Sequence, residues 1–374
     1  MKIAILDTYY PAFLKSVYLR NDGLDNRTYD EQLKVLFDEC FGTSDFYSRH
    51  LKELGCEAID LVANSIPLAY SWVCENDYKI SKWQLGIDPR ITRLPYVGSW
   101  FTRVPGLVRV VVEQVRQIKP DILYCQNISY LHPNVLRELN SCVKLIVGQI
   151  ASAMPPDHYL VSYDLILTSF PHFVRRFRDK GLSAEYFRIG FDTHIIEKLG
   201  SIEKDLGVTF VGGISAAHSQ GTALLEFLAG ATDIDFFGYG RELLPKNSKI
   251  RSRHHGEVWG LDMYRALVRS RITVNRHIDV AENYANNMRL YEATGVGAML
   301  ITDRKDNLSE LFDIGREVEV YSSPEEAAEL INYYMAHPLE AGVVARAGQD
   351  RTLKEHTYQQ RMVELVSILE RYLP

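Results

Sequence analysis

Residues 286–303 read NNMRLYEATGVGAMLITD, which predicts a short helix followed by a buried strand. The helix opens on Asn286 and Asn287 and carries Glu292 one turn in, and glycines end it before the apolar run. Backbone amides at a helix N-terminus favour phosphate oxygens, and a carboxylate in the first turns can accept both hydroxyls of a ribose. The stretch is therefore typical of a site for a phosphorylated, ribose-bearing ligand. The alternative is an ordinary αβ unit in which glycine caps the helix and Glu292 is solvated.

Length and composition narrow the class of protein. A chain of 374 residues suggests two domains, and 46% hydrophobic with 24% charged residues is typical of a soluble globular protein. A net charge of −6 gives no support for a nucleic-acid partner. Five cysteines without zinc-type spacing predict buried free thiols in a reducing cytosol. With no signal peptide and no run of eighteen apolar residues, we expect a cytoplasmic protein.

Short apolar runs alternate with helical patterns, which favours parallel sheets covered by helices. In the first half, strands are expected at Lys2–Asp7, Ala58–Ala63, Asp121–Cys125, Lys144–Gln149, Leu165–Thr168 and Glu185–Ile189. In the second half, they are expected at Thr209–Val211, Ile234–Phe237, Ile272–Asn275, Met299–Thr302 and Glu317–Tyr321. We therefore predict an α/β fold of two Rossmann-like domains, residues 1–192 and 206–357. A last helix within residues 358–374 could pack back on both domains.

Two segments permit a second interpretation. Residues 66–105 match no βαβ unit and hold three of the four tryptophans. We expect an irregular insertion held to its domain by aromatic side chains, and stacking on sugar faces is the alternative. Residues 104–115 are apolar on one face and include Arg109, which predicts a crossover helix. A peripheral contact with a membrane surface is the alternative there.

Loops after the strands are where ligands bind in open α/β sheets. Gly212 and Gly213 follow an expected strand, and paired glycines let the backbone approach a diphosphate. His218 lies just beyond them and is a candidate catalytic residue. His254 and His255 lack a matched set of carboxylate or thiol ligands, so we expect no metal site.

The first half offers polar candidates of its own. Gly42 and Thr43 lie in a turn that starts a helix, where backbone amides can meet an acceptor or a phosphate. Gln126 and Asn127 follow an expected strand and suit hydrogen bonds to sugar hydroxyls, although capping and surface turns explain such residues equally well. The chain has no GxSxG, HExxH, Walker lysine loop or dinucleotide GxGxxG, which argues against hydrolases, proteases, kinases and dehydrogenases.

From about Gly207 onward, the order of motifs resembles the group-1 type of GT-B glycosyltransferases, including CgeB-like proteins. The matching motifs are Val211-Gly212-Gly213, His255-Gly256-Glu257-Val258, Arg271-Ile272-Thr273-Val274-Asn275, Asn287-Met288-Arg289, Tyr291-Glu292 and His356-Thr357-Tyr358. The resemblance implies two domains facing across a cleft, with a nucleotide-sugar donor on the second domain and an acceptor on the first. The acceptor would be a glycan, a lipid-linked sugar or a protein, as in polysaccharide biosynthesis.

The resemblance also implies roles for residues. Glu292 would hold the ribose, Asn286, Asn287 and Arg289 would lie near the diphosphate or donor sugar, and Gly212 and Gly213 would admit the phosphates. Such enzymes need no metal, so Arg289 would act catalytically by neutralising the departing nucleoside diphosphate.

The chain departs from the best-known retaining members in lacking the basic pair expected after Gly213, where Ser215, His218 and Ser219 stand instead. This leaves two alternatives to transfer: a catalytically silent scaffold that binds a nucleotide or a partner, and a sugar-nucleotide epimerase.

Overall fold

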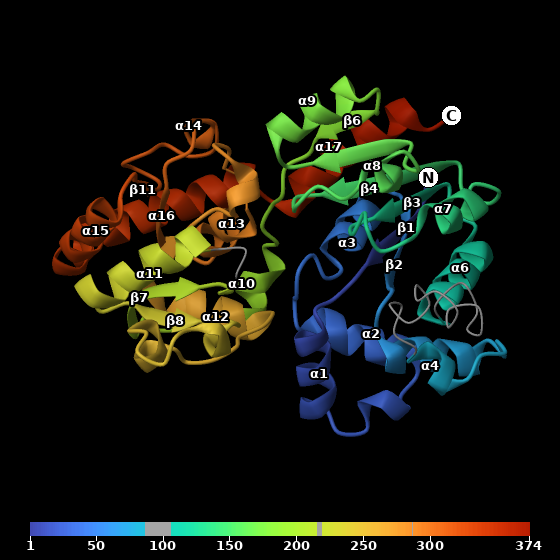
Figure 1. The fold of residues 1–374 in the computed structure, drawn as a ribbon, viewed down its shortest axis with the longest axis horizontal. Helices are drawn as coiled ribbons and strands as arrows, with labels where there is room; N and C mark the ends of the chain where they lie inside the picture. The colour runs from blue at the N-terminus through green and yellow to red at the C-terminus, as the bar shows by residue number, and fades with distance from the viewer. Residues whose placement is uncertain (87–105, 215–218, 286) are drawn as a thin grey trace.

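The computed structural model describes residues 1–86, 106–214, 219–285 and 287–374. Figure 1 shows two lobes, each built on a central sheet with helices on both faces. The chain passes once from the first lobe to the second and returns at its C-terminal end, because α17 (Tyr358–Tyr372) lies with the first lobe.

The first lobe contains a six-stranded parallel sheet in the order β2-β1-β3-β4-β5-β6. Its strands are β1 (Lys2–Asp7), β2 (Glu57–Val62), β3 (Ile122–Cys125), β4 (Leu145–Ile150), β5 (Leu165–Thr168) and β6 (Ala184–Tyr186). Three central strands, β3, β4 and β5, are buried at every position, which is why they read as unbroken apolar runs.

Helices and short turns of 3-10 helix connect these strands. They are α1 (Pro11–Arg20), η1 (Leu24–Asn26), α2 (Tyr29–Asp38), α3 (Phe46–Glu53), α4 (Ile66–Glu75), α5 (Lys82–Leu85), α6 (Gly106–Ile118), α7 (Pro133–Leu139), α8 (Asp157–Leu160), α9 (Pro171–Asp179) and α10 (His194–Leu199). The excursion that holds α1 and α2 follows β1 directly, so it overhangs the carboxyl end of that strand.

The second lobe contains a five-stranded parallel sheet in the order β11-β10-β9-β7-β8. The strands are β7 (Leu206–Val211), β8 (Asp235–Phe237), β9 (Ser270–Asn275), β10 (Met299–Asp303) and β11 (Glu319–Tyr321). The connecting elements are α11 (Ser219–Ala231), η4 (Arg241–Leu243), η5 (Ile250–Arg253), α12 (Leu261–Arg269), η6 (Asp279–Ala281), α13 (Met288–Gly295), α14 (Leu308–Leu311), α15 (Pro324–Ala336) and α16 (Pro338–Glu355).

The predicted α/β fold with two parallel sheets is confirmed, and each expected strand has a counterpart. Several boundaries were wrong by two or three residues: β7 begins at Leu206 rather than Thr209, and β6 ends at Tyr186 rather than Ile189. The end of β6 has a physical reason. Its partner β5 ends at Thr168, opposite Tyr186, so the chain beyond has no neighbouring strand to pair with. The 18-residue helix α16 was not expected, because its many small and polar residues give little apolar periodicity.

The segment expected to be irregular, residues 66–105, contains two helices in its described part, α4 and α5, joined by irregular chain at residues 76–81. Ser65 precedes α4, which has proline in its first turn, and Ser81 starts α5 with a capping box. The rest, residues 87–105, lies outside the described part. In α6 the valines at 108, 110, 111, 112 and 115 are buried, most of them against the sheet, as a crossover helix requires.

The expectation of buried free thiols holds only in part. All five cysteines are free, but only Cys40 and Cys125 are buried; Cys56 and Cys142 are partly exposed, and Cys74 is exposed. In the described part of the chain, no helix is long and apolar enough to cross a membrane.

In both sheets, the order in which successive strands are added reverses at the first strand of the lobe. In the first sheet β1 lies between β2 and β3, and in the second β7 lies between β8 and β9. Successive connections leave in opposite directions at such a strand, which opens a crevice beyond its carboxyl end. Asp7 ends β1 and Val211 ends β7, so the loops that follow these two residues are where a ligand is expected.

Candidate active site

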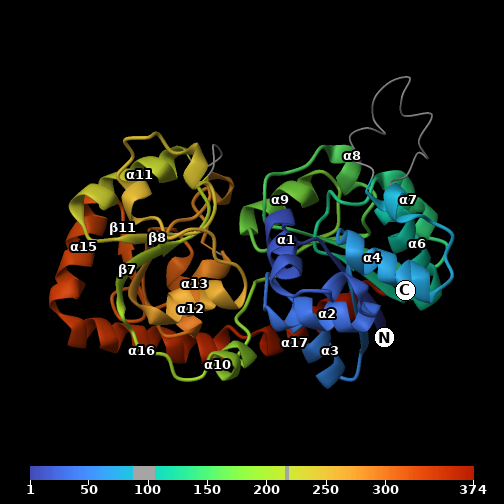
Figure 2. The same ribbon diagram turned by 90° about the horizontal axis from the view of Figure 1, so that it is seen from below.

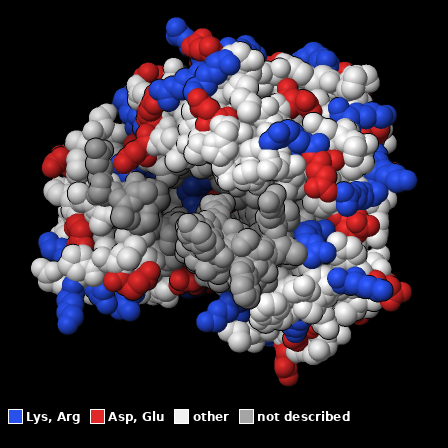
Figure 3. All heavy atoms as spheres, turned by 45° about the vertical axis from the view of Figure 1, so that its right-hand side comes forward, with Lys and Arg blue, Asp and Glu red and all other residues white. Residues whose placement is uncertain are grey.

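A cavity of about 600 Å³ lies between the two lobes. Its walls come from the carboxyl ends of both sheets, including Asp7 after β1, Gln126 after β3 and Gly212 after β7. Figure 3 shows a hollow between the two halves with a basic side chain visible inside it. We call the side built by residues 7–152 the N-wall and the side built by residues 211–292 the C-wall.

The C-wall begins at the loop that follows β7. A Cβ on Gly213 would overlap the ring of Tyr239, so this position needs glycine for packing alone. The same lack of a side chain leaves the backbone of Gly212 and Gly213 open to the cavity, which both residues line. The structure therefore supports both interpretations of these glycines.

The helix α13 supplies the charged part of the C-wall. Arg289 Nη1 lies 2.7 Å from Glu292 Oε2, and Arg289 Nε donates to the Val211 carbonyl at 3.0 Å. Tyr264 Oη donates to Glu292 Oε1 at 3.4 Å. Glu292 is 5% exposed, so it is neither solvated nor free to move. The ordinary αβ-unit interpretation, which required a solvated Glu292, is wrong on this point.

Asn287 has a structural task that competes with ligand binding. Its side chain caps α13 by accepting from Leu290 N at 3.2 Å, and its Nδ2 donates to Asn275 Oδ1 at 3.0 Å. This leaves the backbone amides of Met288 and Arg289 as the first-turn donors without a partner inside the helix. These amides, rather than the Asn287 side chain, are the groups available to a phosphate at this helix end.

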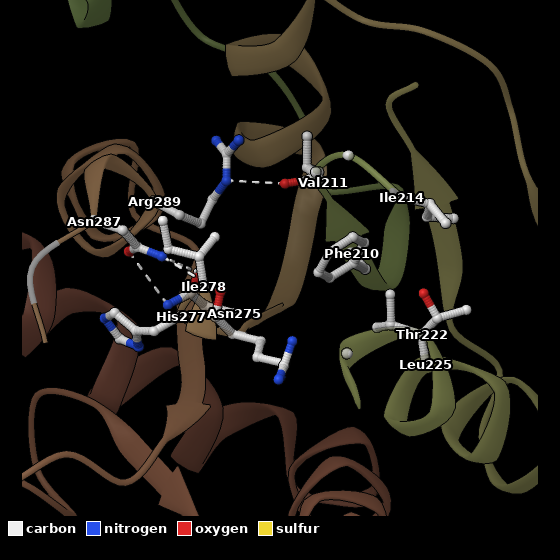
Figure 4. A pocket seen from close by; sticks show the side chains of 14 residues that line it. Phe210, Val211, Ile214, Thr222, Leu225, Asn275, His277, Ile278, Asn287 and Arg289 are labelled. Carbon is white, nitrogen blue, oxygen red and sulfur yellow. Dashed lines mark hydrogen bonds between the residues drawn. The ribbon is translucent and has the colours of Figure 1, made fainter. Parts of the chain in front are cut away.

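A smaller cavity of about 170 Å³ adjoins this helix end (Figure 4). Gly212, Gly213, Asn287 and Arg289 line both cavities, so the two are parts of one site. The smaller cavity is also lined by Asn275, the last residue of β9, and by Arg276 and His277 directly after it. Figure 4 shows the Arg289 side chain directed at the Val211 carbonyl, to which it donates a hydrogen bond.

At the edge of this part of the site lies a histidine–carboxylate pair, in which the His277 side chain is buried and the Asp303 side chain is 18% exposed. His277 Nδ1 lies 2.7 Å from Asp303 Oδ1, which also accepts from the His277 backbone amide at 3.0 Å. Burial would raise the pKa of Asp303, but the contacts with His277 and Lys305 outweigh it and lower that pKa to about 2. The pair fixes the loop after β9, on which the Asn275–Asn287 contact depends.

The N-wall carries no basic side chain among its described residues. Thr43 Oγ1 lies 2.9 Å from Gln126 Oε1 and 3.3 Å from Asp7 Oδ2, and Thr8 N donates to Asp7 Oδ1 at 2.7 Å. Burial raises the pKa of Asp7 to about 6, although its bonds with Thr8 and Thr43 oppose the shift. The sequence predicted Asp7 only as the last residue of a strand and indicated no functional role for it.

Aromatic rings from both lobes close one side of the cavity. The Trp259 and Tyr239 rings are stacked, with centroids 5.7 Å apart, and Phe41 and Tyr10 meet Trp259 edge-on at 5.8 and 5.6 Å. Next to them, Leu261 N donates to the Glu39 carbonyl at 2.7 Å. This closing wall was not predicted, because neighbours contributed by two domains leave no local sequence pattern.

The lobes are also held together at this edge by charge. Arg20 on α1 lies 2.8 Å from Asp262 on α12. Lys198 on α10, a helix that follows β6 and packs against α12, lies 2.8 Å from Asp38 on α2. A Cβ on Gly260 would overlap the Glu39 carbonyl, and Gly260 also has a φ of +51°, so both packing and backbone conformation favour glycine. The described conformation is therefore one in which the two walls are in contact.

The candidate residues expected from the sequence come together where they are described. Those that line the larger cavity are Gly42, Thr43, Gln126, Asn127, Gly212, Gly213, Asn287, Arg289 and Glu292. His218 and Asn286 lie outside the described residues. The described residues contain no group of three or more His, Cys, Asp and Glu side chains that could hold a metal ion. The binding roles of all these residues stay predictions.

Comparisons with known proteins agree with this geometry. Residues 220–367 match a family described as glycosyl transferase-like, whereas no curated protein gives a match. Sucrose-phosphate synthase from Thermosynechococcus elongatus shares the fold with a TM-score of 0.58 and 12% identity, over 99% of this chain and 98% of that chain.

Two further solved structures share the fold at similar levels. HepE from Anabaena, in complex with UDP-glucose, has a TM-score of 0.59 and 13% identity, over 98% of this chain and 99% of that chain. AviGT4, a glycosyltransferase involved in avilamycin A biosynthesis, has a TM-score of 0.58 and 13% identity, over 100% of this chain and 98% of that chain.

The fold is thus that of the GT-B class, with two Rossmann-like lobes and a cleft between them. Residues 220–367 match the glycosyl transferase-like family, and the whole chain shares its fold with solved structures that include the glycosyltransferase AviGT4.

Proposed function

We propose that the C-wall binds a nucleoside diphosphate sugar and that the protein transfers its sugar to a hydroxyl group held by the N-wall. One observation carries this proposal above the others. A single cavity joins an open glycine loop, a helix N-terminus and a buried Arg289–Glu292 pair on one lobe to uncharged amides and hydroxyls on the other. The two walls suit the two halves of a transfer reaction.

The donor orientation follows from the order of groups along the C-wall. The diphosphate would lie against Gly212 and Gly213 and the first-turn amides of α13, where partial positive charge is concentrated. Glu292 lies about one turn further into the helix, within reach of the ribose hydroxyls. Its carboxylate is held by Arg289 and Tyr264, so little ordering remains to be done when the nucleotide binds.

Arg289 has the position to assist departure of the nucleotide. It lines both cavities and is 15% exposed at its side chain, so its charge acts where water is scarce. Negative charge develops on the leaving phosphate oxygen in the transition state, and a fixed cation there stabilises it more than in water. We therefore propose transfer without a metal ion, with Arg289 and helix amides as the charge-neutralising groups.

The N-wall favours a sugar hydroxyl as acceptor. Its polar lining consists mainly of side-chain amides and hydroxyls, contributed by Thr43, Gln126, Asn127, Ser129, Gln149 and Ser152. These are the groups that hydrogen-bond neutral polyols, whereas a phosphorylated acceptor would meet no cation on the described part of this wall. A glycan or a lipid-linked sugar suits this wall. The five free cysteines support a reducing compartment such as the cytoplasm as the place of the reaction.

The first test is nucleotide binding. Thermal shift and calorimetry of the purified protein would be run against UDP, GDP, ADP and CMP and their sugar conjugates, beginning with UDP-glucose because HepE is seen with it. A ligand at a hundredfold excess over its dissociation constant stabilises the folded state by about 2.7 kcal/mol. We expect one nucleoside diphosphate to stand out.

The Glu292→Gln variant assigns the site. Loss of the ribose contact should weaken nucleotide binding by about 10-fold to 100-fold, the effect of losing one charged hydrogen bond. Glu197→Gln is the matched control, because Glu197 is 75% exposed at its side chain and far along the chain from α13. Unchanged affinity in Glu292→Gln would remove the donor assignment. Isomerised donor in the absence of any acceptor would favour an epimerase instead.

A further inference from the structure

The loop between β9 and α13 joins the proposed donor site to the first lobe. We call residues 276–285 the bridging loop. Its first three residues, 276–278, line the smaller cavity. Its middle packs on the first lobe instead, because Ala281 is 1% exposed and belongs to the same apolar cluster as residues of β3, β5 and α9, with Val280 packed against that cluster. One short loop therefore contacts both the cavity and the opposite lobe.

Three contacts with α9 hold the middle of the bridging loop. The rings of His172 and Tyr284 are stacked, with centroids 4.9 Å apart and an angle of 14° between the planes. His172 Nε2 lies 3.3 Å from the Val280 carbonyl oxygen, and Arg176 Nη2 lies 2.7 Å from Glu282 Oε1. In Figure 1, α9 lies at the top of the first lobe and α1 at the bottom. The lobes therefore touch at a second place, apart from the aromatic and charged contacts described above.

The bridging loop contains a strained residue. Glu282 has a φ of +51° and a ψ of −121°, a conformation that residues other than glycine rarely adopt. Such strain persists only where the surroundings fix the backbone. Here the fixing groups come from both lobes: Arg176 holds the Glu282 side chain, and Lys305 Nζ donates to the Glu282 carbonyl at 2.7 Å. The shape of this turn therefore depends on contact between the lobes.

Arg276, at the start of the bridging loop, is a cation beside the open glycines. It lines the smaller cavity with Gly212 and Gly213, and its side chain is 16% exposed. A Cβ on Gly221 would lie 2.3 Å from Arg276 Nη1, so glycine leaves room for the guanidinium at the first turn of α11. Arg276 Nη2 lies 2.7 Å from Asp279 Oδ1. This contact uses one of five N–H groups, so donors remain for a phosphate.

We propose that Arg276 binds the diphosphate of the donor in place of the basic pair that the chain lacks after Gly213, and that α9 of the first lobe positions Arg276 through the bridging loop. This rests on the proposed function. Asp279 begins η6, which is held on the first lobe, and Asp279 orients Arg276. His172 and Arg176 are positioning residues, since neither lines the two cavities. Donor affinity thus depends on side chains of the opposite lobe that do not touch the donor.

The first measurement is calorimetry of nucleoside diphosphate binding, beginning with UDP and continuing with GDP, ADP and CDP. Arg276→Ala should weaken binding by about 10-fold to 100-fold, the effect of losing one charged hydrogen bond. Arg271→Ala is the matched control, because Arg271 is an exposed arginine on β9 that lines neither cavity. Its affinity should stay within about twofold of the unchanged protein.

The second measurement tests the route from α9 to Arg276. Arg176→Glu and Glu282→Arg each bring like charges together, and both side chains are 47% exposed, so the fold tolerates either change. Each should weaken nucleotide binding by about threefold to tenfold. The double variant restores the pair with exchanged charges and should bind within about twofold of the unchanged protein. In the Arg276→Ala background, Arg176→Glu should have no further effect, because it acts through Arg276.

Arg20→Glu separates positioning of the bridging loop from closure of the lobes in general. Arg20 also pairs across the lobes, 2.8 Å from Asp262, and is 44% exposed, but it belongs to the other contact. We expect Arg20→Glu to keep its affinity within about twofold. Equal losses in Arg20→Glu and Arg176→Glu would overturn the route through the loop. The melting temperature of each variant without ligand checks that folding is intact.

Two further results would overturn the proposal. Unchanged affinity in Arg276→Ala would remove Arg276 from the donor site. A double variant that binds as weakly as the two single variants would show that the Arg176–Glu282 pair does not position the loop. In both cases the protein still binds nucleotide and Glu292→Gln still weakens it, so the proposed function stands. If the unchanged protein binds no nucleoside diphosphate, the proposed function and this proposal fail together.

Discussion

The two walls of the cleft are built by the same architecture but carry different chemistry. Each is formed by loops at the carboxyl end of a parallel sheet, at the point where the strand order switches direction. The C-wall combines glycines, a helix N-terminus and Arg289, which together favour phosphate. The N-wall combines amides, hydroxyls and one carboxylate, Asp7, which has no ion pair among the described residues, and together these groups favour a neutral hydroxyl compound.

The contrast shows where function resides in such a fold. Sheet order and strand ends place a crevice in both lobes, but they do not decide what enters it. That decision depends on a few side chains at the loop starts, and the two sets differ mainly in charge. Changes that exchange or remove these charges should therefore separate donor chemistry from acceptor chemistry.

The largest effect is expected at the C-wall. Arg289→Ala should lower kcat/KM by about 10²-fold to 10³-fold, because it removes the cation that neutralises the departing diphosphate. Steady-state kinetics at saturating acceptor measures this. Arg316→Ala is the control, because Arg316 is 77% exposed at its side chain and pairs with Asp313 away from the cleft. Equal rates for Arg289→Ala and Arg316→Ala would remove Arg289 from catalysis.

The second prediction concerns the N-wall, where a substitution should stabilise the fold rather than destabilise it. A carboxyl group whose pKa is raised in the folded state stabilises the fold at low pH and loses that contribution as pH rises from about 4 through about 6. Ionised Asp7 should therefore cost the fold up to about 3 kcal/mol at pH 7.5. Asp7→Asn should raise the free energy of unfolding at pH 7.5 by an amount up to that.

Urea unfolding of the unchanged protein and Asp7→Asn at pH 4.5 and pH 7.5 checks this sign. The gain should shrink at the lower pH, because most of Asp7 is then already protonated in the folded state. A variant less stable than the unchanged protein at both pH values would show that the ionised form is well accommodated.

A third, smaller effect is expected on the stability of the fold from the His277–Asp303 pair, which fixes the loop after β9. Asp303 has a lowered pKa, so its contribution is complete above about pH 4 and is lost as pH falls toward about 2. Asp303→Asn should cost about 2 kcal/mol at neutral pH, and it should flatten the dependence of stability on pH between about 4 and 2. Urea unfolding across this range, in both proteins, measures the difference. Parallel curves would contradict it.

The smallest effect should come from Thr43→Val. This change keeps the shape of the side chain and removes the hydroxyl that lies between Gln126 and Asp7. Because the Thr43 bond lowers the pKa of Asp7, its loss should raise that pKa further by less than about one unit, which an NMR titration of the Asp7 carboxyl carbon measures. Nucleotide affinity should not change. An unchanged pKa of Asp7 would show that Thr43 does not donate a hydrogen bond to it.

The sequence predicted the C-wall better than the N-wall, and the reason is physical. Strands buried on both faces must be apolar along their whole length, so β3, β4 and β5 were visible as runs. The loop at Gly212 and the helix through Glu292 form contiguous patterns. Asp7, in contrast, is a single acid at the end of a strand, and nothing in its neighbours signals that Thr43 and Gln126 will surround it.

Contacts between lobes were beyond prediction for a related reason. The bond from Leu261 N to the Glu39 carbonyl joins backbone atoms, so it depends on no particular side chain at either residue. The sequence reflects the contact only at position 260, where a side chain would overlap the Glu39 carbonyl and glycine is therefore required. Helix α16 was missed because its buried face uses small residues such as Ala341 and Ala345, which contribute little to apolar periodicity.

The return of the chain to the first lobe has a consequence for the order of events during synthesis. Figure 2 shows α16 running along the second lobe and α17 continuing under the first, where α17 packs on α3. Tyr358, Met362 and Leu365 belong to the same apolar core as the strands of the first sheet. A nascent chain folds from its N-terminus as it emerges, at about 5–20 residues per second. The first lobe must therefore wait for the residues of α17, made after the whole second lobe, before its core is complete.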